Sequence, residues 1–227
     1  MRAQVLCDGK NFDVAIQDFN AALRLIPESD EIGRARLLAG RALAEEGLGL
    51  WENAKTDYTV ALDLASRGGS SPDPYVINSR GNCYNSLGMW KEAREDYLVS
   101  SQLFQQAKGY KGPNGSSTAR LDGAIFSASN AALMLAQMGD LQGAMKEMQR
   151  IARRAPGSVD MRAALASLYW ADGRAALAEE EWEFACTKIN TGCAKYTDPD
   201  WLQRIRRWPP VMVSKMQDFV QIRTSAS

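Results

Sequence analysis

Residues 81–97 read GNCYNSLGMWKEAREDY, and this stretch decides the fold. In its second half Trp90, Ala93 and Tyr97 follow at intervals of three and four residues, so they share one face of a helix. A small residue between two large ones lets a neighbouring helix approach closely. Gly88, two residues before Trp90, suits the left-handed conformation that ends a helix. The stretch therefore predicts two antiparallel helices joined at Gly88.

The same ladder occurs at five places in the chain. A large or apolar residue is followed three residues later by a small alanine, four further on by another large residue, and three beyond that by a fourth member of the face. The four columns are Phe12, Trp51, Trp90, Leu141 and Ala175; Ala15, Ala54, Ala93, Ala144 and Ala178; Phe19, Tyr58, Tyr97, Met148 and Trp182; and Ala22, Ala61, Ser100, Ile151 and Ala185. Such copies predict a stack of helices with these columns in its core.

Glycine stands two residues before the first column in four of the five copies, at Gly49, Gly88, Gly139 and Gly173, and Lys10 takes that place in the first. We therefore predict an all-α solenoid of about five helical hairpins. The first hairpin is incomplete because only residues 1–7 precede its turn, which favours a native chain that extends further upstream.

Residues 81–97 resemble a tetratricopeptide repeat (TPR). The signature places are Gly81, Tyr84, Leu87, Gly88, Trp90, Ala93 and Tyr97, and parts of the motif recur at residues 48–54 and 138–144. The resemblance covers residues 1–190. The copies are spaced by 39, 39, 51 and 34 residues, whereas the family repeats about every 34. The extra residues predict loops at 67–73 and 109–117, which are rich in glycine, serine and proline.

The resemblance implies that the first helix of each hairpin lines a groove that holds an extended peptide or a helix. It places the following residues on that groove: Tyr75, Asn78, Asn82, Asn85, Phe126, Asn130 and Trp170. Asn82 is the residue whose amide would pair with a peptide backbone; Asn78 and Asn85 could instead be merely solvated. Arg36 is the only cation at the groove places, so binding of an acidic chaperone tail is not expected.

After residue 188 the ladder stops, and residues 191–227 are predicted to form a separate C-terminal segment. Residues 201–208 suggest a short helix, and Pro209 and Pro210 lead into a last helix with an apolar side. One interpretation is a cap that covers the end of the repeats. The other is a docking surface made of Arg204, Arg206, Arg207 and Trp208.

Composition narrows the function classes. Lys and Arg together number 27, as do Asp and Glu, and the chain has no histidine. A neutral chain is a poor nucleic-acid binder, and the commonest general base is absent. The cysteines lack zinc-site spacing. Cys186 and Cys193 could pair, but free thiols are the default expectation. We predict no catalytic residue, cofactor, metal site or transmembrane segment.

The C-terminal segment carries a weaker resemblance to plastid TPR proteins of plants and algae. It rests on Cys193, Lys195, Tyr196, Asp198, Trp201, Leu202 and residues 205–210. It implies a chloroplast, thylakoid-associated location and a role as assembly or accessory factor of a photosynthetic complex such as a photosystem; otherwise the protein would be soluble and intracellular. The function hypothesis is a non-catalytic protein–protein interaction scaffold. The alternatives are a permanent structural subunit docked by its C-terminal cap, and, less favoured, a regulatory domain of an enzyme.

Overall fold

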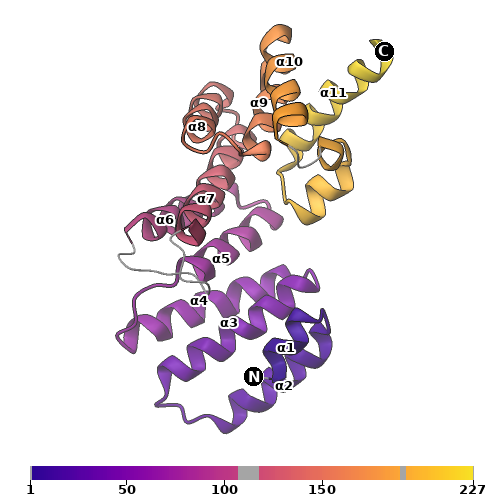
Figure 1. Ribbon diagram of the computed structural model, residues 1–227. Coiled ribbons are helices and arrows are strands. Elements are labelled where there is room, and N and C mark those ends of the chain that lie inside the picture. The colour runs from indigo at the N-terminus through magenta and orange to yellow at the C-terminus, as the bar shows by residue number, and fades with distance from the viewer. Residues whose placement is uncertain (1, 107–117, 190–192, 227) are drawn as a thin grey trace. The chain divides into compact units, whose positions relative to one another are not determined.

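The computed structural model describes residues 2–106, 118–189 and 193–226 (Figure 1). The described residues form helices and their connections, with no strand among them, which confirms the all-α prediction. The chain divides into two compact units, which we call unit 1 (Met1–Ala107) and unit 2 (Lys108–Ser227). The loop predicted at 109–117 lies outside the described residues.

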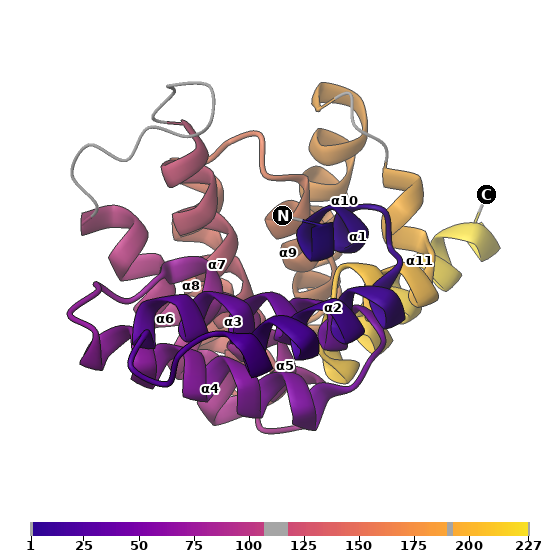
Figure 2. The same cartoon turned by 90° about the horizontal axis from the view of Figure 1, so that it is seen from below.

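Unit 1 consists of three helical hairpins. Their helices are α1 (Arg2–Asp8), α2 (Phe12–Leu25), α3 (Glu31–Gly47), α4 (Trp51–Arg67), α5 (Pro74–Ser86) and α6 (Trp90–Gln106). Each odd-numbered helix is the first of its hairpin and packs on the even-numbered helix that follows; α4 also packs on α5, so α3, α4 and α5 lie side by side (Figure 2). The loop predicted at 67–73 is confirmed between α4 and α5, and α1 is the predicted short first helix.

Unit 2 contains two further hairpins and a C-terminal part. The hairpins are α7 (Thr118–Gln137) with α8 (Leu141–Arg154) and α9 (Val159–Ala171) with α10 (Ala175–Glu183). The chain continues through three short helices, η1 (Phe184–Lys188), η2 (Cys193–Thr197) and η3 (Trp201–Ile205), into α11 (Pro210–Ala226).

The predicted turns are confirmed by the backbone. Gly49, Gly88 and Gly173 have φ of 75° and Gly139 of 95°, in the left-handed region that glycine enters at no steric cost. Lys10, at the same place in the first hairpin, has φ of 59°. The chain therefore reverses at one fixed position in every hairpin.

The second and third columns of the ladder form the core as predicted, whereas the first column does not: Phe12, Trp51, Trp90 and Leu141 are half-buried and Ala175 is exposed. The alanine column, Ala15, Ala54, Ala93, Ala144 and Ala178, is fully buried in every copy. The large side chains of the third column, including Tyr58 and Tyr97, are buried beside it. Gly81 shows how close the helices come, because a Cβ there would lie 2.8 Å from Cε1 of Tyr97. This close packing explains why small residues recur at fixed spacing.

The C-terminal part, which we call the arm (residues 193–221), does not extend the stack as another hairpin would. In the regular hairpins a first helix packs, among the helices that precede it, mainly on the second helix of the previous hairpin, as α5 does on α4. Helix α11 instead packs on the first helices α9 and α7. The arm therefore lies along the face of unit 2 that the first helices form.

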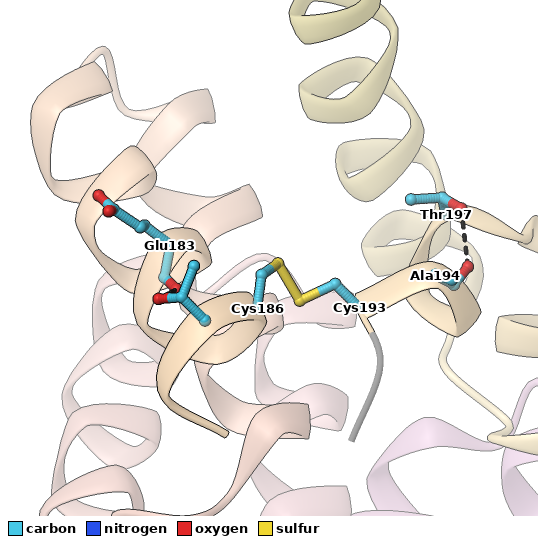
Figure 3. The surroundings of a disulfide bond; sticks show 6 residues. Glu183, Cys186, Cys193, Ala194 and Thr197 are labelled. Carbon is cyan, nitrogen blue, oxygen red and sulfur yellow. Dashed lines mark hydrogen bonds between the residues drawn. A yellow bond between two sulfur atoms is a disulfide. The ribbon is translucent and has the colours of Figure 1, made fainter. Parts of the chain in front are cut away.

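Cys186 and Cys193 form a disulfide, which corrects the expectation of free thiols. Figure 3 shows the bond linking η1, at the end of the last hairpin, to η2, the start of the arm. The two Cα atoms lie 5.2 Å apart, a distance that suits a disulfide. Cys7 and Cys83 are buried thiols that form no disulfide, and burial was predicted for Cys83.

Candidate functional site

Two arginines of unit 1 form ion pairs with aspartates of the same unit. Arg41 donates from Nε and Nη2 to the carboxylate of Asp57 at 2.6 and 2.8 Å, and Arg80 makes the same paired contact with Asp96 at 2.8 Å. Hydrogen bonding to these carboxylates raises the pKa of both guanidinium groups. Each pair joins the first and second helices of one hairpin, so neither arginine is available to a ligand.

Asn82 belongs to a chain of polar contacts that joins two hairpins. Its amide nitrogen donates to Oε1 of Glu46 at 3.2 Å, and its amide oxygen accepts from the Tyr97 hydroxyl at 2.9 Å. The Tyr58 hydroxyl donates to the other oxygen of Glu46 at 2.9 Å. Burial, followed by the nearby Glu46 charge, raises the pKa of Tyr58. The Asn82 amide thus has an internal role, which sequence reasoning did not foresee.

Glu45, the residue before Glu46 in the sequence, has a carboxylate that is almost out of solvent. Its side chain is 9% exposed, and the Arg41 Nε is 4.0 Å from Oε1. Desolvation, followed by repulsion from Asp57, raises the pKa of Glu45 to about 7. A pKa raised by folding means that ionising Glu45 favours the unfolded chain. Its contribution to stability is therefore fully present below the ordinary carboxyl pKa and is lost as the pH rises through about 7.

Replacing Glu45 with glutamine is expected to remove this pH dependence. At pH 8 the variant should be more stable than the parent by about 2 kcal/mol, less than the full pKa shift implies because solvent reaches part of the carboxylate. At pH 4 the two should be nearly equal. Urea unfolding at both pH values measures the difference, with the exposed Glu52→Gln as control. An equal gain at both pH values would mean that the effect does not come from ionisation.

Unit 1 carries a groove of about 620 Å³ over α3, α4 and α5. Its floor is rich in small residues, Ala35, Ala39, Gly40, Ala61 and Ala65, and its remaining lining comes from Ile32, Arg36, Leu43, Leu62, Ser70, Ser71, Asp73, Tyr75 and Val76. Leu43 and Tyr75 are large apolar or aromatic side chains that stay 40% and 46% exposed. An open, mostly apolar hollow of this size can take side chains of a peptide segment.

Charge in this groove comes from two residues. Asp73 accepts a hydrogen bond from the backbone of Tyr75 at 2.8 Å, so its charge is offset by the N-terminus of α5. Arg36 is exposed and, within the part of the chain that the structure describes, has no hydrogen-bond or ion-pair partner. Of the other predicted groove residues on α5, Asn78 is half-buried and Asn85 is buried.

In unit 2 the corresponding face is covered by the arm. Arg206 donates to Asp160 of α9 at 2.8 and 2.5 Å and to the Asn130 side-chain oxygen at 2.8 Å. Its guanidinium also lies 4.6 Å from the ring centre of Phe126. Trp208 is 2% exposed, and its Nε1 donates to Asp160 at 3.1 Å. Predicted groove residues and predicted docking residues thus contact one another.

Further contacts hold α11 against the hairpins of unit 2. Phe219 is fully buried, with ring centres 5.9 Å from Trp170 and 5.5 Å from Trp182. The backbone nitrogen of Val211 donates to the Gln137 side chain at 2.9 Å. A hollow of about 490 Å³ with a mixed polar and apolar lining remains beside the Asp160 cluster. The arm is therefore part of the core of unit 2.

Arg204 and Arg207 are the two remaining residues of the predicted docking surface. Arg204 is exposed and pairs with Asp200 on its own turn of helix at 2.5 Å. Arg207 is half-buried and has a positive φ of 59°. Asp160, which receives both Arg206 and Trp208, was not among the predicted site residues. The sequence did offer a signal, because Asp160 on α9 occupies the same position in the repeat as Phe126 on α7, which was among the predicted groove residues.

Stacked helical hairpins with a groove on the first helices define the chain as an α-helical repeat protein. Solved structures with a similar fold include one described as a TPR protein. The crystal structure of MamA matches with a TM-score of 0.62 at 14% identity, over 82% of this chain and 93% of that one. YrrB, a TPR protein with an unusual peptide-binding site, matches with 0.60 at 17% identity, over 83% and 82%. NprR, solved in complex with its cognate peptide NprX, matches with 0.64 at 13% identity, over 98% and 62%.

Sequence comparison adds no closer relative. No family model matches the chain, and no curated protein matches it. Within the described residues, no helix combines the length and apolar character needed to cross a bilayer. What the chain shares with the solved structures named above is therefore the fold.

Proposed function

We propose that the protein is a non-catalytic scaffold that holds a segment of a partner protein in the groove of unit 1. The observation that carries this proposal is the contrast between the units. The arm occupies part of the first-helix face of unit 2 and leaves a hollow of about 490 Å³ there, whereas the groove of unit 1, of about 620 Å³, is open along α3 and α5 and presents Leu43 and Tyr75. The fold supports the proposal, since YrrB has a peptide-binding site and NprR is solved with a peptide.

A charge placed in the groove tests this function. Peptides would be selected from a random phage-displayed library on the full chain and then measured by fluorescence anisotropy. Leu43→Asp is expected to weaken their binding at least tenfold, because a carboxylate on the groove wall would be desolvated by an apolar ligand. Circular dichroism should stay unchanged, since Leu43 is 40% exposed.

Leu98→Asp is the matched control. Leu98 is 41% exposed on α6 and does not line the groove, so this variant should bind like the parent. Equal losses in both variants, or no peptides enriched by the parent over Leu43→Asp, would contradict groove binding.

A photosynthetic assembly role in the chloroplast remains a finer proposal, supported by the resemblance of residues 193–210 alone. Several of these residues, including Tyr196, Leu202 and Trp208, are buried in unit 2. Their pattern therefore has a folding reason that would apply in any compartment. Docking of the chain as a permanent subunit through its arm would require Arg206 and Trp208 to leave these internal contacts.

A further inference from the structure

One place in the repeat recurs on the first helices of both units. It stands fifteen residues before the first-column residue of its hairpin. It is occupied by Arg36 on α3, Tyr75 on α5, Phe126 on α7 and Asp160 on α9. We call it the grip position, because in unit 2 it is where the arm is held.

The arm shows how two neighbouring grip positions hold a chain segment. Arg206 stacks on the aromatic ring of Phe126, and its charge is met by Asp160 on the next first helix. Two residues later Trp208 is buried against the same carboxylate. One charged side chain, one aromatic ring and one nearby bulky residue thus make the contact.

In unit 1 the two grip positions also carry one ring and one charge, but the charge has the opposite sign and the order is reversed, with Arg36 on the earlier helix α3 and Tyr75 on the later helix α5. Both Arg36 and Tyr75 line the open groove. Tyr75 supplies the ring, 46% exposed, and Arg36 supplies an exposed cation in place of the acid. The arm of a second copy does not suit this place, since Arg206 would meet Arg36. A carboxylate suits it, because guanidinium binds carboxylate through paired, charge-assisted hydrogen bonds.

We propose that the groove of unit 1 binds a partner segment that presents one Asp or Glu side chain to Arg36, with a bulky apolar residue close to it in sequence. This inference rests on the proposed function and adds the chemistry of the partner. The small-residue floor receives the apolar side chain, and Tyr75 packs against the stem of the acid. A single cation needs a single acid, so a run of acids gains little more.

The peptides selected above test the inference on the full chain. They are resynthesised with acetylated N-termini and amidated C-termini, so that a terminal carboxylate cannot stand in for the side chain. We expect one shared acidic position, whose replacement by Asn or Gln weakens binding about 10- to 100-fold. Arg36→Ala should cause a similar loss, and the two changes together should cost little more than either alone.

Arg36→Glu provides the specificity test. Selection on this variant should enrich Lys or Arg at the position where the parent enriches Asp or Glu. Selected peptides that lose affinity with Leu43→Asp but carry no common acid, or that bind Arg36→Ala unchanged, would overturn the inference and leave groove binding standing. Absence of any groove-dependent peptide would overturn both.

Discussion

Trp208→Ala is expected to lower the free energy of unfolding of unit 2 by about 3–5 kcal/mol, the usual cost of truncating a buried tryptophan. The side chain is 2% exposed, its ring centre lies 5.9 Å from that of Tyr196, and its Nε1 donates to Asp160. Removing it leaves a cavity and also one fewer donor on the part-buried carboxylate of Asp160. Hydrogen exchange measures the effect, and the amides of α11 and α9 should lose most protection.

Ile205→Ala is the control from the same arm, because Ile205 is 63% exposed and its truncation should change stability by less than about 0.5 kcal/mol. The variant pair also separates the two interpretations of the arm. If Trp208→Ala left α11 fully protected while abolishing binding to a partner, Trp208 would be a docking residue and its burial in unit 2 would not matter for folding.

The repeat fold was readable from the sequence because its signals are local. Trp90, Ala93 and Tyr97 lie within two turns of one helix, and Gly88 acts on the turn directly before them. Each such signal depends on backbone geometry and on residue size, both of which the sequence states. Repetition at five places then reinforced a pattern that one copy would have left ambiguous.

The residues of the candidate site were predicted only in part, because contacts between residues far apart in sequence decide which side chains are engaged inside the protein. Tyr75 was placed on the groove and lines it, and Arg36 was recognised as the cation of the groove. Asn82 shares the same face, but Glu46 and Tyr97, 36 and 15 residues away in sequence, engage its amide. No spacing rule within one helix reveals such partners.

The path of the arm was the feature least accessible to sequence reasoning. Arg206 meets Asp160 across 46 residues and Asn130 across 76. An apolar last helix can cover either the end of a stack or its side, and both choices bury the same side chains. The disulfide was not expected, because a separation of seven residues permits a bond between Cys186 and Cys193 but does not show whether the thiols are oxidised.

Arg206→Met is expected to destabilise unit 2 by about 3 kcal/mol, the lower end of the range for a buried pair, because it leaves the part-buried carboxylate of Asp160 without its counter-ion. The Arg206 side chain is 9% exposed and that of Asp160 is 15% exposed, so water entering from the adjacent hollow replaces only part of the lost hydrogen bonding. Methionine keeps much of the packing on Phe126, which limits the change to the charge. Urea unfolding of the full chain, with hydrogen exchange to assign the loss to unit 2, measures it.

Adding Asp160→Asn to Arg206→Met should recover about 2 kcal/mol, since a neutral amide oxygen can still accept from Trp208 and no unpaired charge remains. Arg204→Met is the matched control, and it should leave stability unchanged because its pair with Asp200 is exposed. The opposite ordering, with Arg206→Met harmless and Arg204→Met costly, would mean that the arm is held by its outer face. If the ion pair between Arg206 and Asp160 anchors the arm, the unfolding free energies of the double mutant must show coupling between these two residues. Neither of them should show coupling with Arg204.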